Sequence, residues 1–195
     1  RAGHYNSVYA LNAWLICKVF IMYLLIRRVL LIACCAASVC LFSPAGKAEF
    51  FKPTWKSTYQ TIQKDFPKAR QIDQDQFVTL YVNTEKKYML LDIREAAEFR
   101  VSHLHNAILA SDANVAMAVL KHTPKDTPII VYCSVGYRSS AVAEKLQTAG
   151  FKDVKNLKGG IFHWANNNRP VYQGKQLTNK VHPYDRYWSA LLQRR

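Results

Sequence analysis

Acidic residues are scarce in this sequence of 195 residues, and none occurs before Glu49. The chain carries 27 Lys and Arg against 13 Asp and Glu, for a formal net charge of +14. It contains no run of five or more like charges, so most of the basic side chains are expected to form a solvated face. The charge favours small anionic ligands and gives little support to nucleic acid binding, so no nucleic acid partner is predicted.

Cysteine is almost absent from the larger part of the chain. Four of the five cysteines fall in the apolar N-terminus, at Cys17, Cys34, Cys35 and Cys40, and only Cys133 lies beyond them. If that N-terminal segment is removed, the rest of the chain cannot form an internal disulfide. A lone thiol in an exported protein is a candidate reactive group, although a single cysteine is more often a small buried hydrophobic residue.

The sequence also lacks a metal-binding pattern. His103 and His105 are close together, but no further cluster of Cys and His with ligand spacing accompanies them. We therefore interpret both histidines as loop residues and predict neither a metal nor an organic cofactor.

Residues 1–48 are interpreted as a hydrophobic leader, because residues 10–42 are strongly apolar and only three basic residues interrupt them. With Met22 as the start, a basic region is followed by an apolar region and then by small residues, which is the pattern of a signal peptide. Cleavage after Ala45 or Ala48 would release the remainder. We predict an exported protein, located in a bacterial periplasm.

Other roles for the leader stay open. It could remain uncleaved as a membrane anchor, although neither apolar run reaches the roughly 20 residues that a spanning helix needs. The segment Leu31-Ile-Ala-Cys34 resembles a lipoprotein cleavage box, but the apolar run before it is short. The aromatic and basic C-terminal tail, residues 173–195, could dock on the domain or, like the leader, touch a membrane transiently.

Short helices and strands alternate after the leader. Helices are predicted at 54–66, 74–82, 95–101, from Asp112 or Asn114 to about 122, at 139–148, and around Trp164. Strands are predicted at 88–93, 107–110, 129–132 and 154–157. Residues 88–93 form a continuous apolar run, as expected of a strand buried on both faces, and residues 129–132 are rich in β-branched side chains. This alternation predicts an α/β fold, with a parallel sheet covered by helices on both faces.

Cys133 directly follows the clearest of these strands, 129–132, and a loop leads from it into the next helix. Reactive groups in parallel α/β sheets lie at the carboxyl ends of strands. A strand–loop–helix connection turns successive backbone N–H groups inward as an anion-binding nest above a helix N-terminus. Such a field should favour the thiolate. A thiolate here could accept a sulfane sulfur and hold it as a persulfide.

The side chains of this loop suit the same chemistry. Gly136 permits a tightly curved backbone, and Arg138 supplies a fixed positive charge for an anionic sulfur donor. The small side chains of Ser134 and Ser139 are expected to leave room over the thiol, with Ser139 at the start of the following helix.

Three separated segments resemble the rhodanese family. Residues 91–108 resemble its D-x-R-x-x-x-E-[FY]…G-H-I-x-G-A segment, residues 133–139 its active loop C-x-x-G-x-R-S, and residues 156–164 its closing L-x-G-G-x-x-x-W segment. On this resemblance we predict a rhodanese domain at 69–172, between an N-terminal extension at 49–68 and the C-terminal tail.

The resemblance implies a five-stranded parallel sheet flanked by helices and an enzyme of the thiosulfate sulfurtransferase class. Cys133 would carry sulfur from thiosulfate or another small anionic donor to cyanide or a thiol. Asp92 and Arg94 would organise the neighbouring loop. The residues implied in binding the anion are Ser134, Val135, Gly136, Tyr137, Arg138 and Ser139. Ser102 replaces the family's glycine, and His105-Asn106 replaces its Pro-Gly; because asparagine tolerates left-handed turns, the loop is expected to survive.

Two other functions compete with sulfur transfer. Phosphatases of the Cys-Arg type have five residues between these two side chains, whereas Cys133 and Arg138 have four, and the shorter loop suits a single sulfur better than a phosphate. A non-catalytic module with the same fold could instead carry sulfur, sense sulfide or bind a partner, because a fold does not fix a function.

Overall fold

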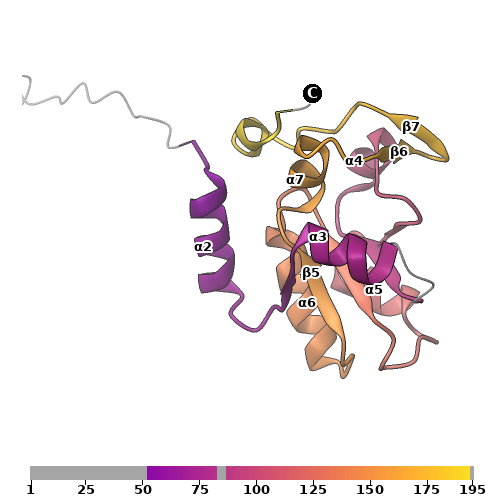
Figure 1. Ribbon diagram of the computed structural model, residues 1–195. Coiled ribbons are helices and arrows are strands. Elements are labelled where there is room, and N and C mark those ends of the chain that lie inside the picture. The colour runs from indigo at the N-terminus through magenta and orange to yellow at the C-terminus, as the bar shows by residue number, and fades with distance from the viewer. Residues whose placement is uncertain (1–51, 83–86, 194–195) are drawn as a thin grey trace, which may run out of the picture. The chain divides into compact units, whose positions relative to one another are not determined.

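The apolar strand β4 (Ile129–Tyr132) lies at the centre of the sheet in the computed structural model, which describes residues 52–82 and 87–193. Five strands lie in the order β1-β5-β4-β2-β3, and every neighbouring pair is parallel (Figure 1). The other strands are β1 (Gln71–Ile72), β2 (Met89–Asp92), β3 (Ile108–Leu109) and β5 (Val154–Leu157). The predicted five-stranded parallel sheet is confirmed.

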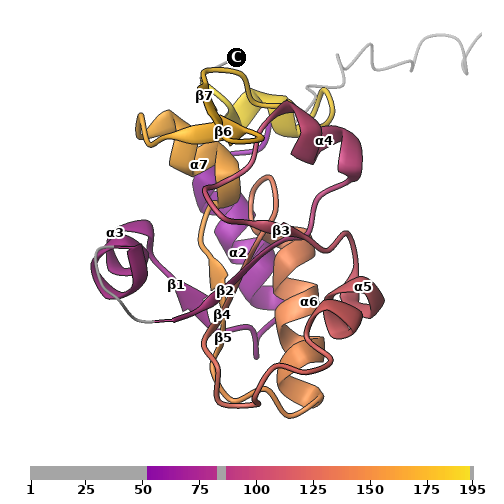
Figure 2. The ribbon, with the colours of Figure 1, turned by 90° about the vertical axis from the view of Figure 1, so that its right-hand side faces the viewer.

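Helices cover both faces of this sheet, as predicted. They are α2 (Trp55–Asp65), α3 (Gln74–Phe77) with a π-helical continuation (Val78–Val82), α4 (Ala96–Val101), α5 (Ala113–Val119), α6 (Tyr137–Thr148) and α7 (Gly160–Asn166). Figure 2 shows α3 on one side of the sheet and α5 and α6 on the other.

Two cores result because successive side chains of a strand point to opposite faces. In β4, Ile130 and Tyr132 join the core that also contains side chains of α3 and α7. Ile129 and Val131 join the core that also contains side chains of α5 and α6. All four side chains are fully buried, which is why this strand is a continuous apolar run in the sequence.

The structure departs from the predicted elements in a few places. Helix α6 begins at Tyr137, two residues before the predicted start at Ser139, because Gly136 takes the capping position with a left-handed φ of 100°. Strand β1 was not predicted. Neither was the antiparallel hairpin of β6 (Val171–Gln173) and β7 (Gln176–Thr178), nor the 3₁₀ turn η2 (Trp188–Leu191). These elements are only two to four residues long, and those that are strands contain polar residues and form no continuous apolar run like that of β4.

The described chain on either side of the predicted domain packs with it in one compact unit. Trp55 of α2 packs against the core under α7, and Val181, Leu191 and Leu192 are buried in that core. The described part of the tail therefore docks on the sheet domain. The predicted leader lies outside the described residues, and within the described part of the chain no helix is long and apolar enough to cross a bilayer.

The buried tail predicts a stability effect far from the sheet. Leu192 is 2% exposed, whereas Leu177 in the β6–β7 hairpin is 69% exposed. Leu192→Ala should lower the free energy of unfolding by about 2–5 kcal/mol, because it empties a packed site. Leu177→Ala should change it by less than about 0.5 kcal/mol. Urea unfolding of both variants provides the measurement, and equal small effects would mean that the tail does not belong to the core.

Candidate active site

Cys133 lies at the carboxyl end of β4, where the sheet opens toward the N-terminus of α6. Its thiol is 1% exposed, and Sγ accepts the backbone N–H of Gly136 at 3.2 Å. The loop between the strand and the helix thus curls back so that a backbone donor faces the sulfur. The sequence predicted a nest of several inward N–H groups, and this bond supplies one such donor.

The first turn of α7 holds the other side of the loop. The carbonyl oxygens of Cys133 and Ser134 accept the N–H groups of Ile161 and Phe162, both at 3.0 Å. A Cβ atom on Gly160 would overlap the Cys133 oxygen and come within 2.8 Å of the Ser134 oxygen. A residue without a side chain is therefore required at this contact. Because these carbonyl groups bind α7, their peptide planes are fixed and the loop cannot rotate freely.

Gly136 turns the loop into α6 and is held from two sides. Its φ of 100° is a conformation that residues with a Cβ rarely adopt. Its carbonyl oxygen accepts Asn156 Nδ2 at 3.2 Å, and Asn156 Oδ1 accepts the Ser139 hydroxyl at 2.5 Å. Helix α6 is 12 residues long, so its first-turn N–H groups and its dipole favour negative charge next to the loop. Ser139 is fully buried in this arrangement, and its hydroxyl anchors the turn.

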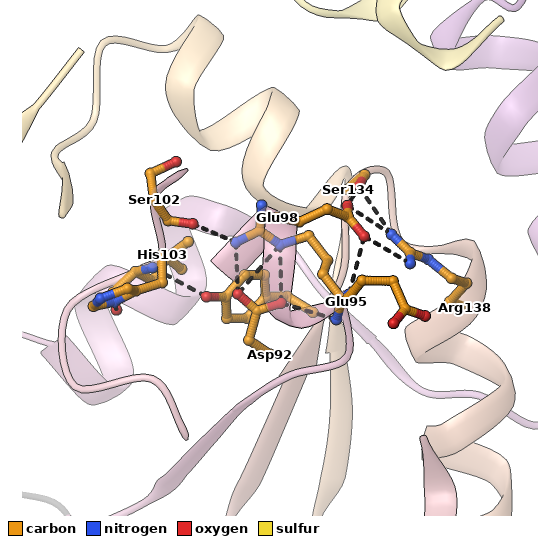
Figure 3. A network of polar contacts seen from close by, with 10 residues as sticks. Asp92, Glu95, Glu98, Ser102, His103, Ser134 and Arg138 are labelled. Atoms are coloured by element: carbon orange, nitrogen blue, oxygen red, sulfur yellow. Dashed lines mark hydrogen bonds and ion pairs between the residues drawn. The ribbon is translucent and has the colours of Figure 1, made fainter. Parts of the chain in front are cut away.

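Arg138, which was predicted to supply a fixed positive charge for an anionic donor, binds Glu98. Nη1 and Nη2 each donate to one carboxylate oxygen at 2.9 Å, and Nη2 also contacts Ser134 Oγ at 3.1 Å (Figure 3). Ser134 in turn donates its hydroxyl to Glu98 Oε1 at 2.8 Å. Glu98 from α4 thus ties together both ends of the Cys133 loop.

The pKa values of this pair follow from its contacts. Burial alone would raise the pKa of Glu98, but the hydrogen bonds from Arg138 and from the Glu95 backbone, with the charge of Arg138, lower it overall. Burial alone would lower the pKa of Arg138, yet its hydrogen bonds to Glu98 and the negative charges of Cys133 and Glu98 raise it. Both groups stay charged, and most of the guanidinium charge is balanced locally.

Asp92 and Arg94 form a second ion pair, entirely inside the protein. Arg94 Nε and Nη2 donate to the Asp92 carboxylate at 2.9 and 2.7 Å, and Nη2 also donates to the Ser102 carbonyl oxygen at 2.5 Å (Figure 3). Both side chains have no exposed surface. Burial lowers the pKa of Arg94, and Asp92 more than reverses this. This pair therefore organises the loop after α4 and has no solvent path of its own to a substrate.

The loop after α4 tolerates its departures from the family pattern. Ser102 is in extended backbone with a φ of −167°, a conformation that needs no glycine. Asn106 takes a φ of 58°, as predicted for a residue that tolerates the left-handed region. His103 stacks on Phe99 with ring centroids 4.3 Å apart. Within residues 52–82 and 87–193, no group of three or more His, Cys, Asp and Glu side chains could hold a metal ion.

The remaining loop residues face the surrounding structure. Val135 is 3% exposed and belongs to the core that contains α7. Tyr137 donates its hydroxyl to Asp65 at 2.8 Å and packs edge-on against Phe66. Their side chains therefore attach the loop to its surroundings, which leaves the backbone of the loop to line the site.

Sequence reasoning missed two residues that shape this site. Glu98 and Asn156 are buried and bind the Cys133 loop from α4 and β5. The sequence did contain a signal that could have identified Glu98. It is the acidic residue six positions after Asp92, in a segment that resembles the family's pattern. Asn156 gave a weaker signal, a polar residue within a short apolar strand.

Known proteins resemble the part of the chain that carries this site. A family model described as the rhodanese-like domain matches residues 60–167. A protein named sulfurtransferase from Allochromatium vinosum is 31% identical over 103 residues, which cover 53% of this chain and 94% of that protein. The probable adenylyltransferase/sulfurtransferase MoeZ of Mycobacterium tuberculosis is 30% identical over 91 residues, which cover 46% of this chain and 23% of MoeZ.

A solved structure shares the fold. The crystal structure of thiosulfate sulfurtransferase from Pseudomonas aeruginosa aligns with a TM-score of 0.53 at 18% identity, over 65% of this chain and 25% of that one. At this identity the likeness concerns the fold alone. The present chain spans about a quarter of the length of MoeZ and of several other long relatives.

The lowered pKa of Glu98 predicts a pH dependence of stability. A carboxyl group whose pKa falls on folding stabilises the protein above its unfolded value of 4.5, and this contribution is lost as the pH drops through the lower folded value. Glu98→Gln should therefore destabilise the protein by about 1.5–3 kcal/mol near neutral pH, because it weakens charged hydrogen bonds.

Chemical denaturation between pH 7 and pH 3 measures this difference. The gap between the original protein and Glu98→Gln should narrow as the pH falls below 4.5. Asp126→Asn is the matched control, because Asp126 is an exposed carboxylate in the loop before β4, and the contacts of Glu98 and Arg138 do not include it. A gap that stays constant with pH would show that the carboxylate charge of Glu98 does not stabilise the fold.

Proposed function

The chain belongs to the rhodanese-like family, and on that premise we propose that it is a sulfurtransferase that carries sulfur as a persulfide on Cys133. The donor is thiosulfate or another small anionic sulfur compound, and the acceptor is cyanide or a thiol. The observation that carries this proposal is the position of Cys133 Sγ, which faces the Gly136 N–H at 3.2 Å in a loop fixed by α7.

The proposed reaction divides into two transfers at one sulfur atom. The Cys133 thiolate attacks the outer sulfur of thiosulfate, a sulfur–sulfur bond forms on the protein, and sulfite leaves with the electron pair of the broken bond. The terminal sulfur of the persulfide is then attacked by cyanide or by a thiolate. Thiocyanate or a new persulfide leaves, and Cys133 returns as a thiolate. No external oxidant or reductant is needed in either step.

The protein's contribution is to stabilise the negative charge that the sulfur at Cys133 carries in both steps. Backbone N–H groups and the N-terminus of α6 would stabilise the thiolate and then the persulfide anion. Arg138 would contribute less to donor binding than a free guanidinium, because Glu98 occupies both Nη atoms. We infer that the backbone is the main anion-binding element of this site and that the Arg138–Glu98 pair keeps it in shape.

Two alternatives remain testable beside this one. A Cys-dependent phosphatase would need Arg138 to bind the phosphate. The carboxylate of Glu98 would compete directly with that phosphate for the guanidinium. A non-catalytic module that carries sulfur or senses sulfide would use the same loop, and the deep burial of the thiol fits slow exchange. A stable sulfur adduct without turnover would favour the module.

The persulfide mechanism predicts a defined mass change. After incubation with thiosulfate and washing, the protein should gain about 32 Da, the mass of one sulfur atom, at Cys133. With cyanide added, the adduct should disappear and thiocyanate should accumulate. Cys133→Ala should abolish both signals. Intact and peptide mass spectrometry, with a colorimetric thiocyanate assay, provides the measurement. A folded protein with a free thiol that forms no adduct with thiosulfate would contradict the proposed donor.

We also propose that the protein is exported behind residues 1–48 and works in a bacterial periplasm. The support is the sequence pattern alone: a basic region after Met22, an apolar region, and small residues up to Ala48. The mature protein recovered from its native host should begin after Ala45 or Ala48, as read by N-terminal sequencing. A chain that still begins at Met22 would support the anchored alternative instead.

A further inference from the structure

The chain that follows the β6–β7 hairpin returns to the end of the sheet that carries the Cys133 loop. Val181 is buried before this segment and Leu191 and Leu192 after it. Asn166 of α7 fixes the second end, since its Nδ2 donates to the Leu191 carbonyl oxygen and its Oδ1 accepts the Gln193 N–H, both at 2.8 Å. Figures 1 and 2 both place this C-terminal segment next to α7. We call residues 182–190 the tail segment.

The tail segment places an aromatic ring on the active loop. The centroid of the Tyr184 ring is 4.4 Å from Cζ of Arg138, a distance typical of a cation–π contact. Glu98 and Ser134 already bind the Nη edge of the same guanidinium. The ring therefore covers a flat face of Arg138, five residues along the chain from Cys133.

The backbone of Tyr184 is held in an unusual conformation. Its φ is 65°, in a region that bulky residues seldom adopt. The N–H group of Tyr184 donates to Nδ1 of His182 at 3.0 Å, which stabilises the turn. An unfavourable backbone conformation persists only where surrounding contacts determine it, and such positions are frequent at functional sites.

Tyr184 is at the same time partly open to solvent. It is 41% exposed, the Arg138 side chain beneath it is 27% exposed, and Cys133 is 1% exposed. Of these three side chains, Tyr184 is therefore the most exposed, Arg138 is partly covered, and Cys133 lies deepest. Tyr184 lies outside residues 60–167, the part of the chain matched by the family model.

We propose that Tyr184 is a specificity-determining residue, whose ring narrows the approach to Cys133 so that small sulfur donors and acceptors pass and bulky ones are excluded. This inference rests on the proposed function, because it concerns access to the same thiol. It adds the size class of the reactants: a small donor such as thiosulfate and a small acceptor such as cyanide or sulfide, in preference to large thiols or proteins.

The first test measures access to Cys133 without any sulfur transfer. The full chain is alkylated with iodoacetamide, a small reagent, or with a maleimide attached to a polyethylene glycol chain, a bulky one. Quantification of the Cys133 peptide by mass spectrometry separates this thiol from the four N-terminal cysteines. Tyr184→Ala should raise the rate with the bulky reagent by about tenfold, the usual scale of discrimination by size, and leave the rate with iodoacetamide almost unchanged.

Three further variants distinguish the effect of the Tyr184 ring from the effects of the residues around it. Tyr184→Phe keeps the ring and should retain the original ratio of the two rates. Tyr187→Ala is the matched control, because Tyr187 is also 41% exposed and in the tail segment but packs on Trp188. It should likewise retain the ratio. His182→Ala removes the acceptor of the Tyr184 N–H and should shift the ratio in the same direction as Tyr184→Ala, by a smaller factor.

The second test uses turnover with thiosulfate as donor and cyanide or glutathione as acceptor. Tyr184→Ala should raise kcat/KM for glutathione and leave kcat/KM for cyanide unchanged. An equal change for both acceptors, together with equal changes in both alkylation rates, would overturn the inference, because Tyr184 would then only support Arg138. If no turnover occurs but the alkylation ratio shifts, the proposed reaction is wrong and the inference about access stands. If turnover occurs but the alkylation ratio and the acceptor preference stay unchanged, the proposed reaction stands and the inference about access is wrong.

Discussion

The contact between the first turn of α7 and the backbone of Cys133 and Ser134 is the constraint on which the site depends. Two N–H groups of the helix bind the two loop carbonyl oxygens at 3.0 Å, and Gly160 allows the backbones to touch. Carbonyl groups that point toward α7 leave the opposite side of the loop to N–H groups, because the two point in opposite directions from a peptide plane. The closing Gly-Gly segment of the sequence thus influences the surroundings of the thiol indirectly, because it fixes the backbone of the loop.

Two ion pairs secure this arrangement in different ways. Asp92 and Arg94 are wholly buried and attach the loop after α4 to the end of β2. Removing one partner would leave an unpaired charge in the interior. With both partners present, the pair fixes the conformation of the loop more than it adds to the free energy of unfolding. Glu98 and Arg138 lie closer to solvent and connect α4 to both ends of the Cys133 loop. Without Glu98 the guanidinium of Arg138 would be free to bind an anion, but the Ser134 hydroxyl would lose the carboxylate to which it donates.

The sequence predicted the fold well where a strand is a continuous apolar run. Strands β4 and β2 were found for this reason, and the parallel arrangement followed from the alternation of strands with helices. Strand β1 has two residues and a polar side chain at Gln71, so only its pairing with β5 creates it. The start of α6 was misplaced because Gly136 caps it through a left-handed backbone, whereas serine caps through its side chain.

The candidate site was less predictable than the fold, because its polar contacts join distant parts of the chain. The position of Cys133 could be predicted from the strand before it. The neutralisation of Arg138 could not, because Glu98 is 40 residues away in sequence. The contact between Arg138 and Tyr184 was even harder to predict from the sequence. It depends on a left-handed backbone at Tyr184 and on a tail anchored by Leu191 and Leu192. The Cys133 loop lies within residues 60–167, the part matched by the family model, whereas Tyr184 reaches Arg138 from a segment beyond that part. The strand that locates the thiol in the sequence therefore carries no information about the ring over Arg138.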